Sequence, residues 1–114
     1  MEVIPHAEDT YDYEGRYSIG RTDFVCPAEL SAEESAEVSA IAASAYETLG
    51  AAGAVRVDLM LGPGGPQALE VNAIPGLTDT SLLPMAAEAA GMGFEALVER
   101  LVELAVARTT AARG

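Results

Sequence analysis

The sequence predicts an α+β fold in which an antiparallel sheet packs against helices. Two runs of alternating apolar residues, 54–61 and 67–73, flank a cluster of glycine and proline, which is typical of two strands joined by a turn. Two longer segments, 31–49 and 94–107, carry apolar residues at helical spacing. The chain has 114 residues, of which 50% are hydrophobic, so one small domain can bury a core.

The chain is strongly acidic, with a formal net charge of −12 and a pI of about 4.2. This charge argues against binding to nucleic acid or to anionic membranes, because both interactions require a basic surface. No apolar run approaches the ~20 residues of a membrane span, and no signal peptide is visible. Cys26 is the single cysteine, which excludes an intramolecular disulfide. We therefore expect a cytoplasmic protein.

The N-terminal part is predicted to be a short strand, residues 2–4, followed by a long polar connection, residues 7–30. A connection of this length is usually functional or mobile. It carries three tyrosines, Tyr11, Tyr13 and Tyr17. They either pack on the body of the domain as amphipathic cover or belong to a lid that excludes water from a reaction.

The first helix is predicted over residues 31–49. Ser31, followed three positions later by Glu34, has the pattern of a capping box at the start of a helix. Gly50 and Gly53 are expected to end it. We interpret this helix as core support without a chemical role.

The two predicted strands form a hairpin whose register follows from its apolar residues. In an antiparallel pair, directly opposed residues share a face, and burial of one face fixes which residues are opposed. With all odd-numbered apolar residues on one face and a turn near Gly64, Asp58 lies opposite Glu70 and Arg56 opposite Asn72. The two carboxylates then repel each other across the ladder.

Two interpretations of this polar face remain open. It is either the solvated side of an ordinary hairpin, where water weakens the repulsion, or a cation site. Asp58, Glu70 and Asn72 would give a hard, all-oxygen set of ligands suited to Mg²⁺, which takes its other ligands from water and phosphate. Met60 shares this face by alternation, and plain hairpin packing explains it equally well.

After the second strand, Pro75 and Gly76 are predicted to turn the chain into a helix over residues 82–90, which Gly91 ends. A glycine at position 76 lets backbone N–H groups approach a ligand closely. The N-terminus of a helix binds carboxylate or phosphate readily. Ser81 is either the N-cap itself or, with Thr80 as the cap, a residue that faces a ligand. The last helix is expected to end at residue 107, with residues 108–114 frayed.

Three stretches of the sequence resemble motifs of the D-alanine–D-alanine ligases, members of the ATP-grasp superfamily. The longest is Leu-Glu-Val-Asn-Ala-Ile-Pro-Gly-Leu-Thr-Asp-Thr-Ser-Leu-Leu-Pro-Met-Ala-Ala, residues 69–87. The others are Arg-Val-Asp at 56–58 and Tyr-Asp-Tyr-Glu-Gly-Arg-Tyr at 11–17. The resemblance covers nearly the whole chain. It implies that residues 1–114 are a single C-terminal subdomain, the C-terminal half of an ATP-grasp module, with residues 7–30 as its lid.

The resemblance also implies an activity, the ATP-dependent joining of two D-alanines for peptidoglycan precursor synthesis. By family likeness, Asp58, Glu70 and Asn72 would hold Mg²⁺ or Mn²⁺ between the β- and γ-phosphates of ATP, with Glu70 able to bridge two metal ions. Arg56, assisted by the Gly76 N–H, would meet the transferred phosphoryl group and the developing oxyanion. Met60 would lie under the adenine.

For the acceptor D-alanine, the resemblance implies a carboxylate site made by Ser81 and the backbone of Leu82. Arg16 stands where the family has a lysine that meets the substrate carboxylate, and the two cations are not interchangeable. Tyr17 matches the family tyrosine associated with D-alanine as second substrate, which favours formation of an amide over an ester.

The family's enzymes also contain an N-terminal domain and a central subdomain that no part of this sequence matches. We therefore expect a fragment or one part of a split enzyme, inactive alone, with the missing domains, D-alanine and ATP as its partners and a homodimer as the full enzyme. Two alternatives stay open. Arg16 and Thr80 depart from the family pattern, so the acceptor can be another amino acid. The chain can also be a non-catalytic interaction fragment.

Overall fold

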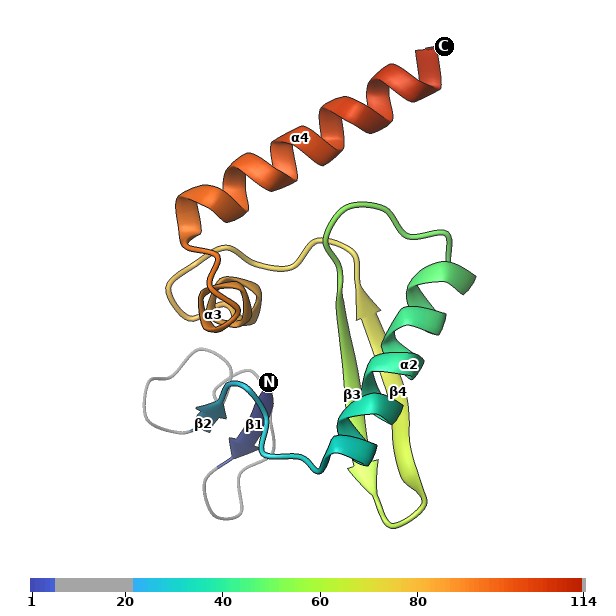
Figure 1. The fold of residues 1–114 in the computed structure, drawn as a ribbon, viewed down its shortest axis with the longest axis vertical. Helices are drawn as coiled ribbons and strands as arrows, with labels where there is room; N and C mark the ends of the chain where they lie inside the picture. Colours follow the sequence, from blue (N-terminus) through green and yellow to red (C-terminus); the bar gives the residue numbers. More distant parts are fainter. Residues whose placement is uncertain (6–21, 114) are drawn as a thin grey trace. The chain divides into compact units, whose positions relative to one another are not determined.

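The structure of the chain, a computed structural model, describes residues 1–5 and 22–113 (Figure 1). The described residues divide into two compact units, one drawn from residues 1–29 and 76–93 and the other from residues 30–75 and 94–114. Each unit contains one pair of antiparallel strands and at least one helix. The predicted α+β class is therefore confirmed.

The second unit begins with helix α2 (Ala32–Thr48), and both of its ends follow the prediction. The Ser31 N–H donates to Glu34 Oε2 at 2.9 Å, and the Glu34 N–H donates to Ser31 Oγ at 3.1 Å, which completes the capping box. At the other end Gly50 takes a left-handed φ of 62°, and the N–H of Ala51 donates to the Tyr46 carbonyl at 3.0 Å. This is the glycine-ended helix terminus that the sequence predicts.

Strands β3 (Arg56–Gly62) and β4 (Gly65–Asn72) form the hairpin. Arg56 pairs with Asn72 and Asp58 with Glu70, as predicted. Beyond Asp58 the register shifts by a β-bulge, and Leu59 pairs with Ala68. The predicted alternation of apolar residues along the whole second strand is therefore wrong, because Leu69 is the extra residue of the bulge.

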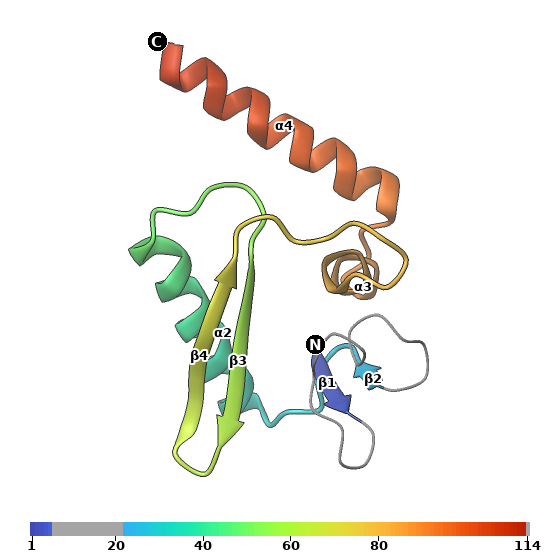
Figure 2. The same ribbon diagram turned by 180° about the vertical axis from the view of Figure 1, so that it is seen from behind.

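Helix α2 packs against one face of this hairpin. Seen from opposite sides, α2 lies in front of the two strands in Figure 1 and behind them in Figure 2. One face of the hairpin is thus covered by the helix. Within this layer the exposed face is the one that carries the polar residues considered below.

The last helix, α4 (Phe94–Arg113), continues past its predicted end at residue 107. The hydroxyl groups of Thr109 and Thr110 donate to the carbonyls of Ala105 and Val106, each at 3.0 Å. The extension has a simple cause in the sequence, because residues 108–113 contain no glycine or proline to end a helix.

The first unit contains the antiparallel strands β1 (Glu2–Pro5) and β2 (Thr22–Val25) and helix α3 (Leu82–Ala89). β1 confirms the predicted first strand. The prediction of a continuous polar connection over residues 7–30 is wrong at its C-terminal end, where β2 pairs with β1. Helix α3 ends at Ala89, one residue before the predicted end, and Gly91, which has a φ of 89°, follows its C-cap Ala90.

Few side chains are shielded from solvent in the described part of the chain. Leu97 of α4, 5% exposed, is the only buried hydrophobic residue there. Exposed large apolar residues include Leu49, Met60, Leu69, Ile74, Phe94, Val102 and Val106. None of the described helices has both the length and the apolar character needed to span a membrane.

Candidate functional site

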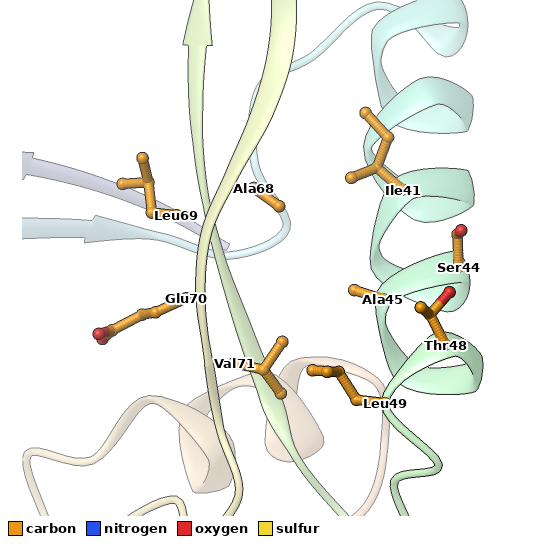
Figure 3. Close-up of a pocket in the computed structure, with 9 residues that line it drawn as sticks. All are labelled: Ile41, Ser44, Ala45, Thr48, Leu49, Ala68, Leu69, Glu70 and Val71. Atoms are coloured by element: carbon orange, nitrogen blue, oxygen red, sulfur yellow. The ribbon is translucent and has the colours of Figure 1, made fainter.

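The face of the hairpin opposite α2 carries four polar side chains from two neighbouring strands. Alternation along β3 puts Arg56 and Asp58 on the same face, and the register puts Asn72 and Glu70 directly opposite them. In Figure 3 the Glu70 side chain points away from α2, so this polar face is the one that the helix leaves open. The predicted meeting of Asp58 and Glu70 on one side of the sheet is therefore confirmed.

Arg56 holds Asp58 in a two-pronged ion pair. Arg56 Nε donates to Asp58 Oδ1 at 2.7 Å, and Arg56 Nη2 donates to Asp58 Oδ2 at 3.0 Å. The two side chains are only 22% and 24% exposed, so water screens the pair incompletely. A guanidinium in this fork geometry makes charge-assisted bonds that are stronger than ordinary ones. The repulsion between Asp58 and Glu70 is thus relieved by the chain itself.

This contact between Arg56 and Asp58 is a feature of the candidate site that our sequence analysis missed. Arg56 and Asp58 are two residues apart on one strand, so their side chains leave the same face as neighbours. That spacing was sufficient to predict the ion pair from the sequence. We had considered only water and a bound cation as ways to relieve the carboxylate pair.

Asn72 shapes the exit from the hairpin. Its Oδ1 accepts a hydrogen bond from the Ile74 N–H at 3.0 Å, which is a local turn of the kind that asparagine favours. An amide oxygen has two lone pairs, so one such bond leaves acceptor capacity for a further ligand.

The bulge brings apolar side chains to the same face. Leu69 and Glu70 both point away from α2 in Figure 3, whereas Ala68 and Val71 point toward it. Met60, on the face of Asp58 by alternation, is also exposed. An apolar border of this kind beside charged groups suits a ligand with both a charged part and an aromatic ring.

A hollow of about 460 Å³ lies between α2 and β4. Its apolar lining includes Ile41, Ala45, Leu49, Ala68 and Val71, whose side chains face one another in Figure 3. The hollow is on the helix side of the hairpin, and the Glu70 carboxylate points out of it. We therefore do not assign it to the polar site.

The first unit holds the second group of predicted residues. Ser81 is the N-cap of α3 by its backbone, but its side chain makes no capping hydrogen bond. Instead Ser81 Oγ accepts from the Thr78 N–H at 2.9 Å and lies 2.7 Å from Thr78 Oγ1. Ser81 is therefore the N-cap residue by position, as one of the two alternatives expected, although its hydroxyl makes no capping bond, and the alternative of a Thr80 cap is wrong. The role of Thr78 was not anticipated.

Gly76 is tightly fitted to this arrangement. A Cβ added at Gly76 would lie 2.6 Å from Ser81 Oγ, closer than side chains tolerate. Leu82 opens α3 directly after Ser81 and is half-buried. The predicted residues Gly76, Ser81 and Leu82 are thus brought together within one unit. Arg16 and Tyr17 lie outside the described residues.

The donor set on the hairpin fits a hard cation by its chemistry. It offers the carboxylates of Asp58 and Glu70 and the amide oxygen of Asn72, and Mg²⁺ prefers such oxygen ligands. In the part of the chain that is described, no group of three or more His, Cys, Asp or Glu side chains is arranged to hold a metal ion. A cation held by Asp58, Glu70 and Asn72 would take its remaining ligands from other oxygen atoms.

Comparison with known proteins gives consistent matches. A family model described as D-ala D-ala ligase C-terminus matches residues 1–103. The D-alanine–D-alanine ligase of Desulforudis audaxviator (strain MP104C) is 48% identical over 108 residues, which cover 95% of this chain and 35% of that protein. The ligase of Methylacidiphilum infernorum (isolate V4) is 42% identical over 109 residues, with 95% and 36% covered. The chain thus spans about a third of the length of these relatives.

Solved structures agree with this match. A crystal structure of D-alanine–D-alanine ligase from Bacillus anthracis superposes with a TM-score of 0.75 at 33% identity, over 93% of this chain and 34% of that one. The same ligase complexed with ATP superposes with a TM-score of 0.70 at 36% identity, over 76% and 30%.

Proposed function

Because the chain belongs to the D-alanine–D-alanine ligase family, to whose C-terminal part it corresponds, we propose that it supplies half of the active site of an ATP-dependent ligase. This half binds Mg–ATP and the acceptor, and the reaction joins two D-alanines for peptidoglycan precursor synthesis. The observation that carries the proposal is the pairing of Asp58 with Glu70, with Arg56 and Asn72 as the neighbouring pair.

On this proposal the hairpin is the phosphate-binding element. Asp58, Glu70 and Asn72 would hold Mg²⁺, which when bound would supply positive charge to neutralise the phosphates of ATP. By family likeness, the proposal gives Arg56 the binding of the transferred phosphoryl group and the developing oxyanion, and it gives the Gly76 N–H an assisting role in that step. The exposure of Met60 is compatible with contact to the adenine ring.

The start of α3 is the proposed site for the acceptor carboxylate. Its first N–H groups carry partial positive charge, and the Ser81 side chain does not cap them. The Ser81 hydroxyl, held by Thr78, and the Leu82 N–H then receive the carboxylate. Arg16 and Tyr17, from the lid, complete the acceptor site in this proposal.

The test is a chimera in which this sequence replaces the C-terminal part of the ligase from Desulforudis audaxviator. We expect Glu70→Gln to lower its turnover at least about a hundredfold, because the amide removes a charged ligand from the cation. Glu99→Gln on the exposed side of α4 is the matched control and should leave turnover unchanged. Full activity of the Glu70→Gln chimera would refute the metal role.

The same chimera identifies the acceptor. The proposal expects D-alanine to be preferred over D-lactate, because Tyr17 matches the amide-forming members of the family. A preference for D-lactate would contradict the role given to Tyr17. A panel of other D- and L-amino acids tests the alternative that Arg16 and Thr80 raise, an ATP-grasp ligase with a different acceptor.

A further inference from the structure

We propose that Arg56 is a built-in counterion of Asp58 that a divalent cation must displace, so the hairpin takes a cation bound to phosphate in preference to the free cation. This inference rests on the proposed function, because it concerns the same cation site. It adds a second role for Arg56, which acts on the cation before it acts on the phosphoryl group.

The geometry of the Arg56–Asp58 pair indicates that the guanidinium competes with a cation for the Asp58 carboxylate. Both Asp58 oxygens accept bonds from Arg56, at 2.7 and 3.0 Å. The surface pair between Arg100 and Glu103 differs in each respect, with a single contact at 3.2 Å and side chains 57% and 66% exposed. A two-pronged, half-buried pair is the kind that holds a defined geometry.

The cation and the guanidinium require the same carboxylate. A cation bound to Asp58 would use an oxygen that already accepts a bond from Arg56, and it would place two positive groups a few ångströms apart. Such charges repel more strongly in a partly shielded site than in bulk water. The cation therefore binds Asp58 more favourably once Arg56 has left it.

The charge on this face favours a cation bound to polyphosphate over a free divalent cation. Among the described residues, the carboxylates of Asp58 and Glu70 and the Arg56 guanidinium together carry one net negative charge, which attracts a free divalent cation more weakly than the two carboxylates alone would. A cation that arrives on a polyphosphate brings anionic oxygens with it. The displaced guanidinium can then bind phosphate oxygens, for which its fork geometry is equally suited.

The backbone allows this exchange without rearrangement. The pairs Arg56–Asn72 and Asp58–Glu70 follow in one uninterrupted register, and the bulge lies beyond them. Rotation of the Arg56 side chain removes it from Asp58, while the strand register keeps Asp58 and Glu70 opposed.

The test uses the chain itself and Mn²⁺ as a paramagnetic probe. Line broadening of the Val57 and Val71 amide signals reports a cation on this part of the hairpin, because these residues lie between the two polar pairs. Titrations are made with Mn²⁺ alone and with Mn²⁺ plus tripolyphosphate. They compare the wild-type chain with Arg56→Met, Arg56→Lys and, as matched control, Arg100→Met.

We expect Arg56→Met to bind Mn²⁺ alone about threefold more tightly than the wild type. Tripolyphosphate should raise the Mn²⁺ affinity of the wild type but not that of Arg56→Met. Arg56→Lys, which keeps the charge but not the fork, should fall between them. In the wild-type chain, Mg²⁺ with tripolyphosphate should shift the Arg56 Nε–H signal, which is a direct readout of the change of partner. Arg100→Met should behave as the wild type.

Equal or weaker Mn²⁺ binding by both Arg56 variants would overturn the inference. If Mn²⁺ binding is nevertheless lost in Asp58→Asn and Glu70→Gln, the proposed cation site remains supported although the counterion role of Arg56 is overturned. Absence of site-specific broadening in every chain would overturn both. Amide spectra of each variant show whether the hairpin is intact, and Arg56→Lys keeps the test decisive if Arg56→Met unfolds.

Discussion

The loop before α3 shows how a single residue fixes the position of a functional group. Gly76 leaves room for the Ser81 hydroxyl, which a Cβ would approach to 2.6 Å. Thr78 holds that hydroxyl through its N–H and its own side chain. Our sequence analysis gave Gly76 the role of admitting a ligand to the backbone. The structure adds a steric role, toward Ser81, which only the fold of the loop reveals.

We predict that Gly76→Ala displaces the Ser81 hydroxyl from Thr78. The added methyl group overlaps the position of the Ser81 hydroxyl, so the Thr78 N–H loses its hydrogen-bond acceptor. Amide hydrogen exchange of Thr78, followed by NMR, should become faster by roughly threefold or more. Gly93→Ala is the matched control, since a Cβ there meets nothing within 4 Å.

A double mutant tests this prediction more directly. Ser81→Ala removes the atom that the new methyl group would meet, so adding Gly76→Ala to it should change little further. Unaltered Thr78 exchange in the Gly76→Ala chain would contradict the steric role of Gly76.

Among the elements, the hairpin shows where sequence reasoning succeeds and where it stops. The apolar pair Val57 and Val71 requires the register that puts Asp58 opposite Glu70, and this was predictable. The two-residue loop pairs Gly62 with Gly65, which is out of step with that register by one residue. The bulge at Leu69 reconciles the two requirements. The sequence predicts the apolar register and the position of the turn separately. That the two conflict becomes clear only when the turn type is known.

The capping box of α2 was predictable in full, because all its requirements are local. The Ser31 N–H bonded to the Glu34 carboxylate, and to a smaller extent the Ser31 side chain, lower the pKa of Glu34 below its ordinary value of 4.5. The folded chain therefore binds a proton at Glu34 less readily than the unfolded chain. The stabilisation is fully present above the unfolded pKa and is lost as pH falls through the folded pKa.

We predict that Glu34→Gln removes this contribution to the pH dependence of stability. Glutamine can still accept the Ser31 N–H bond but does not titrate, so the gap in melting temperature between the two chains should narrow as pH falls below about 4.5. Thermal unfolding followed by circular dichroism between pH 3 and 7 measures it. Glu33→Gln, in the same turn, is the control. A gap that is constant across this range would contradict the prediction.

At the scale of the whole chain, the family was predictable from motifs, but the scarcity of buried apolar residues was not. Half of the residues are hydrophobic, yet among the described ones only Leu97 is a buried hydrophobic side chain. Composition counts apolar residues without saying what covers them. Exposed apolar side chains such as Leu69, Ile74 and Phe94 are available for contact with other protein. Relatives about three times as long have further chain available for such contacts.

This surface and the half-site lead to our last prediction, that the chain alone does not turn over. On our proposal, the hairpin supplies ligands for phosphate and cation from one side only, through Arg56, Asp58, Glu70 and Asn72. Catalysis of phosphoryl transfer depends on positioning from several sides. A coupled assay should therefore detect D-alanine-dependent phosphate release from the chimera and none from the isolated chain. Release by the isolated chain would overturn this. If calorimetry finds no Mg–ATP binding by the chimera either, the exposed apolar surface would instead belong to a non-catalytic interaction fragment.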